Sequence, residues 1–160
     1  MADASLLDYE SAVSHTVTVR VTDSGGLTYD EMFTINVADV ANTLIVTTVD
    51  DNNDSGIIDG NVAYTIEWLN ANPGTDGLIS LREAVIAANN TAGLDIVTFN
   101  IAGVGVQTIQ VTDPDGAGPL AGLPTITDAI AIDGYSQPGA STNTLALGND
   151  AVLQIELDGA

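Results

Sequence analysis

Apolar and polar residues alternate along two stretches in the first quarter of the chain. Every second position is apolar in both: Val17, Val19 and Val21 in the first stretch, and Phe33, Ile35 and Val37 in the second. A period of two is typical of half-buried β-strands. Residues 23–26, Asp-Ser-Gly-Gly, supply a turn between them. The pattern predicts a β-hairpin over residues 13–38, and this hairpin requires further strands because two strands alone are marginally stable in water.

Short β-type runs recur through the rest of the chain, separated by Gly, Pro and Asp. They cover residues 44–49, 96–101, 107–112, 125–127, 129–132 and 152–157. Ile132-Asp133-Gly134 is echoed 25 residues later by Leu157-Asp158-Gly159. That spacing is the size of one solenoid coil, although Asp-Gly turns are also common for other reasons. Residues 62–70 fit either a short strand or a helix, and Pro73-Gly74 ends whichever is formed.

One segment carries a clear helix signal. Ser80 and Glu83 have capping-box spacing, in which the Ser side chain accepts from the N3 amide and the Glu side chain reaches back to the N-cap amide. Leu81, Ala84 and Val85 then begin one apolar face. The pattern predicts a helix over residues 81–90. A lone amphipathic helix among strands indicates a cap over the exposed end of a β core.

The charge of the chain is strongly one-sided. Asp and Glu number 22 against two cations, Arg20 and Arg82, while 45% hydrophobic residues still predict a folded chain. The net charge of −20 excludes binding to nucleic acid or to an anionic membrane through a basic patch. Bound Ca²⁺ would relieve the repulsion between carboxylates. The chain has no Cys, and no apolar run is long enough to span a bilayer.

Residues 6–42 carry three motifs with a shared resemblance. Residues 7–10 read Leu-Asp-Tyr-Glu, residues 23–26 form an Asp-containing turn, and residues 39–42 read Asp-Val-Ala-Asn. The segment resembles the C-terminal part of a cadherin-like repeat. That resemblance implies a β-sandwich and a Ca²⁺ site at its end, formed by Asp8, Glu10 and Asp39. Ala41 and Asn42 stand where the linker motif of that family has Asn and Asp.

Five ordered motifs follow in the second part of the chain. They are Ser-Leu-Arg-Glu-Ala-Val at 80–85, Ala-Ala-Asn at 87–89, Asp-Ile-Val-Thr-Phe at 95–99, Leu-Pro-Thr-Ile-Thr at 123–127 and Ile-Asp-Gly at 132–134. This series resembles the opening of right-handed parallel β-helix surface proteins. The resemblance implies that the helix caps the first coil of the solenoid. Such a stack needs about three coils for stability.

A polar loop at residues 50–59 offers a second candidate calcium site. Asp51, Asn53, Ser55 and Asp59 place oxygen donors at positions 1, 3, 5 and 9 of an EF-hand-like loop, with Gly at position 6. Position 12, which normally carries a bidentate carboxylate, is Val62. The alternative interpretation is a solvated turn rich in Asp and Asn. A shifted frame of residues 50, 52 and 54 gains a carboxylate but moves the Gly out of place.

No residue set in the sequence points to catalysis. His15 is the only histidine and lies within a predicted strand, and no Gly-x-Ser-x-Gly elbow is present. Arg82 fits support of the helix cap better than the base of a polysaccharide lyase. Tyr64 and Trp68 are expected to pack beneath a loop rather than to stack on a sugar. No catalytic residue is therefore predicted.

These patterns together predict a mainly β chain with two parts. Residues 1–42 are expected to form a partial cadherin-like β-sandwich, and residues 43–160 the cap and first coils of a parallel β-helix. The expected function is that of a Ca²⁺-stabilised, non-catalytic structural or adhesion module of a large secreted bacterial surface protein. The alternative is part of an extracellular polysaccharide-active β-helix enzyme. Expected partners are a second copy of the chain, through strand pairing, and a polysaccharide or cell-surface ligand. Met1 is expected to be an expression start on an excised piece.

Overall fold

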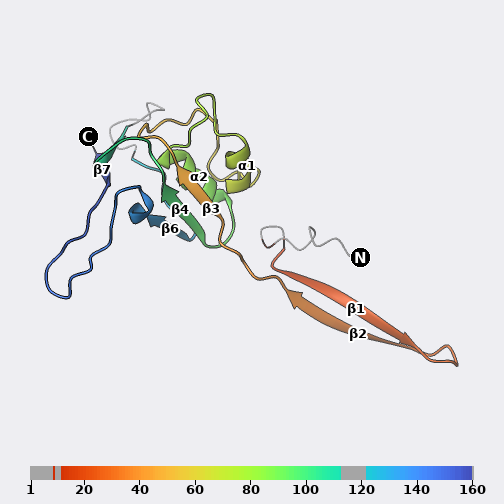
Figure 1. Cartoon of the computed structure of the whole chain (residues 1–160). Coiled ribbons are helices and arrows are strands. Elements are labelled where there is room, and N and C mark those ends of the chain that lie inside the picture. The colour runs from red at the N-terminus through yellow and green to blue at the C-terminus, as the bar shows by residue number, and fades with distance from the viewer. Residues whose placement is uncertain (1–8, 10–11, 113–121, 160) are drawn as a thin grey trace. The chain divides into compact units, whose positions relative to one another are not determined.

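The computed structural model describes residue 9, residues 12–112 and residues 122–159, and the chain is mainly β (Figure 1). It divides into two compact units, residues 1–40 and residues 41–160. The division predicted after residue 42 lies in the linker between the first unit and the first strand of the second. Each unit is described by itself below.

The first unit is built on an antiparallel hairpin. Strand β1 (Ser14–Thr22) pairs with β2 (Thr28–Asn36), which confirms the predicted hairpin. Asp23 closes the turn because its side-chain Oδ1 accepts hydrogen bonds from the amides of Gly25 and Leu27, at 2.8 and 2.9 Å. The register puts Val17 opposite Phe33, so apolar residues share one face of the hairpin. Both side chains are about half exposed.

The described part of the second unit contains two small parallel sheets. In the first, β3 (Thr43–Val46), β4 (Asp95–Phe99) and β6 (Ile130–Asp133) lie side by side in that order (Figure 1). In the second, β5 (Gln107–Val111) pairs with β7 (Ile155–Gly159). All these pairs are parallel. The chain runs from β4 of the first sheet to β5 of the second, and later from β6 of the first sheet to β7 of the second. Each strand of the second passage pairs with the matching strand of the first, β6 with β4 and β7 with β5.

The repeat of Ile-Asp-Gly and Leu-Asp-Gly does not mark this stacking. Ile132 lies in β6 and pairs with Val97, whereas Leu157 lies in β7 and pairs with Ile109. The true offsets are 35 residues from Asp95 to its partner in β6 and 48 residues from Gln107 to its partner in β7. They differ because a long connection, residues 137–154, separates β6 and its following turn from β7. The two Asp-Gly motifs that are 25 residues apart therefore lie at strands of different sheets and do not mark one coil.

The predicted strand at residues 125–127 is not formed. Asn89, from the helix, donates its Nδ2 to the carbonyl of Thr125 at 2.8 Å and accepts the amide of Thr127 at Oδ1, also at 2.8 Å. The side-chain amide thus uses the backbone groups that a neighbouring strand would bond. The other predicted strand positions correspond to β3, β4, β5, β6 and β7 with shifted ends.

Two α-helices lie in the described residues of the second unit. Helix α2 (Leu81–Asn90) has the predicted bounds, and both hydrogen bonds of the predicted capping box are present between Ser80 and Glu83. Helix α1 (Ile66–Ala71) is capped by Thr65, whose Oγ1 accepts the amide of Trp68. The segment that fitted either strand or helix is therefore helical from Ile66 onward.

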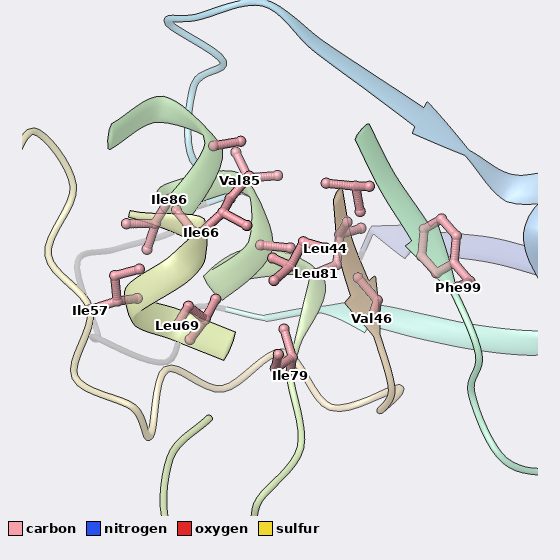
Figure 2. Close-up of a cluster of buried hydrophobic side chains, with 14 of the residues drawn as sticks. Leu44, Val46, Ile57, Ile66, Leu69, Ile79, Leu81, Val85, Ile86 and Phe99 are labelled. Atoms are coloured by element: carbon pink, nitrogen blue, oxygen red, sulfur yellow. The ribbon is translucent and has the colours of Figure 1, made fainter. Parts of the chain in front are cut away.

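The core of the second unit joins these helices to the first sheet. Leu44 of β3, Leu69 of α1 and Val85 of α2 belong to one buried cluster, which Figure 2 shows in close-up. Val97 of β4 and Ile109 of β5 are completely buried in the same cluster. The helices therefore pack at the β3 side of the stack. At the opposite side, β6 and β7 are the last of the described strands.

Side chains continue the strand pairing where β6 ends. The short 3₁₀ turn η2 (Gly134–Ser136) follows β6 and contacts β4. Ser136 Oγ accepts the amide of Phe99 at 2.7 Å, and the buried Gln137 bonds both backbone groups of Ile101, at 2.9 and 2.8 Å. A serine and a glutamine thus satisfy backbone groups that would otherwise be buried without partners.

Candidate functional site

The loop of residues 50–59 is the part of the predicted site that the structure describes in full. Its first predicted ligand, Asp51, has a completely buried side chain and forms an ion pair with Arg82 of α2. Asp51 Oδ1 accepts from Arg82 Nε at 3.1 Å, and Oδ2 accepts from Nη2 at 2.7 Å. The contact is a two-pronged guanidinium–carboxylate pair, the strongest geometry for such a pair.

A third segment joins this buried pair. The amide of Thr112 donates to Asp51 Oδ2 at 2.8 Å, and Arg82 Nη2 donates to the Thr112 carbonyl at 3.0 Å. Thr112 directly follows β5. The pair therefore ties the loop, the first turn of α2 and the end of β5 together, with both charges compensated by protein groups.

Glu83 holds the middle of the same loop. Its side chain is completely buried, and its Oε1 accepts the amide of Ser55 at 2.9 Å while Oε2 accepts the amide of Ser80 at 3.0 Å. Ser80 Oγ donates to the carbonyl of Asn52 at 2.6 Å. The capping-box residues of α2 therefore also hold the loop of residues 50–59 in place through its backbone groups. The sequence pattern predicted the cap but not the loop contacts, because the partners lie 28 residues apart.

The other predicted ligands of the loop bond to protein groups. Asn53 donates Nδ2 to the carbonyl of Ile57 at 2.9 Å, and Ser55 Oγ accepts the Ile57 amide at 3.4 Å. Asp59 is exposed, and its Oδ1 accepts from Asn89 of α2 at 3.2 Å. The four predicted ligands are therefore divided between a buried ion pair, the loop interior and the surface.

The structure does not bring the four predicted ligands of this EF-hand-like loop together at one point. A cation at position 1 would have to displace the guanidinium of Arg82, which already neutralises both oxygens of Asp51. Within the described residues, no three His, Asp or Glu side chains gather where they could hold a metal ion. The positive charge that faces Asp51 in this loop is that of the Arg82 side chain.

A neighbouring carboxylate, Asp54, fixes the chain before α2. Its Oδ2 accepts the hydroxyl of Thr75 at 2.7 Å and the amides of Thr75 and Asp76 at 2.8 and 3.1 Å. These donors stabilise the ionised form, and the Thr75 hydroxyl makes the largest contribution to lowering the pKa of Asp54 below its usual range. Gly74 lies directly against this carboxylate with φ of +93°.

We expect Gly74→Ala to destabilise the second unit by about 2–3 kcal/mol, since it combines a left-handed backbone with a steric clash. An added Cβ would lie 2.5 Å from Asp54 Oδ1 and 2.8 Å from the Ser55 amide nitrogen. Urea unfolding followed by the fluorescence of Trp68, the only tryptophan, measures the loss.

Gly77→Ala is the matched control for this substitution. Gly77 also has a positive φ, +72°, but nothing lies within 4 Å of the position that an added Cβ would take. It should cost only about 1 kcal/mol of backbone strain. Equal losses for the two variants would show that the contact with Asp54 does not hold the chain at this point.

The predicted calcium site of the first unit is described only in part. Asp8 and Glu10 lie outside the described residues. Asp39 follows β2 and is half-buried. In the described part of this unit, the exposed cation Arg20 pairs with Asp30 across the hairpin, with Nε 2.6 Å from Oδ1. This contact lowers the pKa of Asp30.

The residues considered for catalysis or sugar stacking lie in a strand or pack against the core. His15 lies in β1 opposite Ile35. Tyr64 and Trp68 meet edge to face at 4.5 Å between ring centroids and pack against the buried cluster of the second unit. This contact agrees with the expected packing role of the two aromatic rings.

An ordered loop at residues 141–152 had no recognisable signal in the sequence. Ser141 and Val152 pair at its base. Asp150 accepts the amide and the hydroxyl of Thr144 at 2.7 and 2.6 Å, which lowers the Asp150 pKa, and Asn143 accepts the Asp150 amide at 3.0 Å. Short polar residues with such local bonding are typical of ordered turns.

Two further findings bear on function. Among the helices of the described residues, neither is long and apolar enough to cross a membrane. Comparison of the chain with family models, with curated proteins and with solved structures gave no match.

Proposed function

We propose that the chain is a non-catalytic structural or adhesion module of a large secreted bacterial surface protein. The observation that carries this proposal is the parallel stacking of strands in residues 41–160, with helices packed at the β3 side and β6 and β7 last in their sheets. A stack of this kind forms a stiff spacer whose end strands can pair with further strands.

In this proposal the second unit is the cap and first coils of a right-handed parallel β-helix. Support comes from the in-register parallel pairs that join β4 to β6 and β5 to β7. The first unit is proposed as part of a cadherin-like sandwich, since its hairpin has one apolar face that a second sheet would cover. A polysaccharide or cell-surface ligand and a second copy of the chain are the proposed partners.

Calcium is proposed only for the first unit, at Asp8, Glu10 and Asp39. Hard carboxylate oxygens are the ligands that Ca²⁺ prefers, and a metal bound there would offset part of the net charge of −20. The second unit is proposed to be independent of calcium because Arg82 neutralises Asp51.

We expect added Ca²⁺ to raise, and a chelator to lower, the melting temperature of the first unit, measured by calorimetry on the whole chain. At about 5 mM Ca²⁺ and a Kd of about 0.1–1 mM, the stabilisation is about 1–2 kcal/mol. The unfolding transition reported by Trp68 should not move, because that residue belongs to the second unit. Asp39→Asn is the control and should abolish the calcium effect. An unchanged melt in both conditions would contradict the metal proposal.

Polysaccharide turnover tests the non-catalytic role. The chain is incubated with uronate-containing and neutral polysaccharides, and the release of reducing ends or unsaturated uronates is measured. We expect no turnover. Turnover that a single Asp substitution abolishes would overturn the proposal in favour of a polysaccharide-active enzyme.

A further inference from the structure

Tension carried along the backbone reaches the second unit at one defined point. Residues 40–42 connect the two units, and β3 begins directly after them at Thr43. A pull that the backbone transmits from the first unit therefore acts on the amino end of β3. The bonds and contacts of this strand decide how the second unit resists such a pull.

Backbone pairing joins β3 to β4 along the whole strand. The two strands are parallel and in register. At the start of the pairing, the amide of Ile96 donates to the carbonyl of Asn42 at 2.8 Å. At its end, the amide of Asn100 donates to the carbonyl of Val46 at 2.9 Å. In a parallel pair the hydrogen bonds are evenly spaced along the strands, so the load on them can be shared.

Side chains add to the attachment of β3. Thr98 Oγ1 of β4 donates to the carbonyl of Leu44 at 3.2 Å. Thr47, directly after β3, donates its amide to the Ile79 carbonyl and accepts the Ile79 amide at Oγ1, both at 2.9 Å. Leu44 and Val46 are completely buried in the core cluster (Figure 2). Because a close-packed core leaves no free space, β3 cannot slide lengthwise without withdrawing both side chains.

The direction of a pull decides whether these bonds break together or one after another. β3 and β4 run in the same direction, and the chain continues from the carboxyl end of β4 (Figure 1). A pull on the amino end of β3 that is resisted beyond the carboxyl end of β4 acts along the strands and loads all the bonds at once. A pull on the amino ends of both strands loads only the first pair, and the pairs then open in turn. The first geometry needs more force because the whole ladder must break in one step.

We propose that β3 is the load-bearing strand of the second unit, and that tension from the first unit meets the pair of β3 and β4 in shear. This inference rests on the proposed structural or adhesion role and names the element that carries the load. The buried pair of Asp51 and Arg82 ties the segment after β3 to α2. It is a second attachment, which the pull reaches only after β3 has come free.

Two attachment geometries test this proposal on the whole chain. The chain has no cysteine, so two introduced cysteines give unique attachment points for DNA handles in an optical trap. Val40→Cys, at a position that is 79% exposed before β3, is common to both geometries. Val104→Cys, at a position that is 98% exposed, follows β4, whereas Ala92→Cys, also exposed, precedes it. Handles at 40 and 104 shear the two strands, and handles at 40 and 92 peel them apart.

We expect the opening force to be several times higher with handles at 40 and 104 than with handles at 40 and 92. Forced unfolding reports the rate of unfolding along the direction of the pull and not the free energy of unfolding. All three cysteines replace exposed residues, so urea unfolding by Trp68 fluorescence should give the same midpoint for both double variants. The difference in force then comes from direction alone.

Matched deletions of one hydroxyl locate the resistance. Thr98→Val removes the bond to Leu44 across β3 and β4, and Thr108→Val removes the 2.9 Å bond to Glu156 across β5 and β7. With handles at 40 and 104, Thr98→Val should raise the rate of opening under constant force by roughly fivefold, the effect of one hydrogen bond. Thr108→Val should leave this rate unchanged, because β5 and β7 lie outside the part of the chain between the handles.

Two results would overturn the proposal. They are equal opening forces in the two geometries, and an equal effect of the two hydroxyl deletions on the rate of opening. Polysaccharide turnover is measured on the same protein. Turnover overturns the proposed function whatever the forces, whereas equal forces without turnover overturn only the load-bearing role of β3.

Discussion

Arg82→Met is expected to lower the free energy of unfolding of the second unit by about 3–5 kcal/mol, because it leaves a buried carboxylate without its counter-ion. The side chains of Arg82 and Asp51 are 8% and 0% exposed, so water cannot replace the lost partner. The substitution also removes the donor to the Thr112 carbonyl. Urea unfolding followed by Trp68 fluorescence measures the loss, which is a large fraction of the stability of a small domain.

Arg20→Met is the matched control, since Arg20 is the other cation of the chain and also pairs with an aspartate. Its pair with Asp30 is 65% and 40% exposed, where water and salt screen the attraction. The transition reported by Trp68 should stay in place, because Arg20 belongs to the first unit and Trp68 to the second. If Arg82→Met changed that transition as little as Arg20→Met does, the buried pair would not hold the loop of residues 50–59 against α2.

The features that the sequence predicted well are those with local causes. The helix over residues 81–90 follows from Ser80, Glu83 and the apolar face after them, all within one short segment. The hairpin follows from the period-two pattern and the turn at Asp23. In both cases the residues that decide the structure are close in sequence, so no distant partner had to be known.

The candidate site was harder to predict because its contacts are distant in sequence. Spaced Asp, Asn and Ser residues suit a calcium loop and a loop bonded to a helix equally well. The contact that holds the start of this loop comes from Arg82, which lies 31 residues from Asp51. Its position in the first turn of α2 indicated only a role in the cap. Sequence spacing alone offers no reason to pair it with the loop.

The coil length could not be read from the sequence for a related reason. Strand stacking is set by the register of β5 and β7, and the loop at residues 141–152 lengthens the second passage without changing that register. Likewise, Asn89 bonds the backbone of Thr125 and Thr127 in place of a strand. Side chains that replace backbone pairing leave no periodic signal in the sequence.

Glu83→Ala is expected to destabilise the second unit by about 3 kcal/mol, because it leaves one buried and one partly buried amide without an acceptor, at about 1–3 kcal/mol for each unsatisfied group. The amides are those of Ser55 and Ser80, bonded at 2.9 and 3.0 Å. Glu83→Gln should lose less, since its remaining carbonyl oxygen can still accept one of them. Urea unfolding by Trp68 fluorescence again gives the values.

Glu67→Ala is the control for this prediction, because Glu67 also lies in the first turn of a helix, α1, but is exposed. Its loss removes only a favourable interaction with the helix dipole, about 0.3–1 kcal/mol. The order Glu83→Ala, Glu83→Gln, Glu67→Ala in decreasing effect is therefore expected. Equal effects at positions 83 and 67 would mean that Glu83 acts only as a helix cap. A larger effect at position 83, together with faster amide exchange at Ser55, identifies the loop contact as the cause.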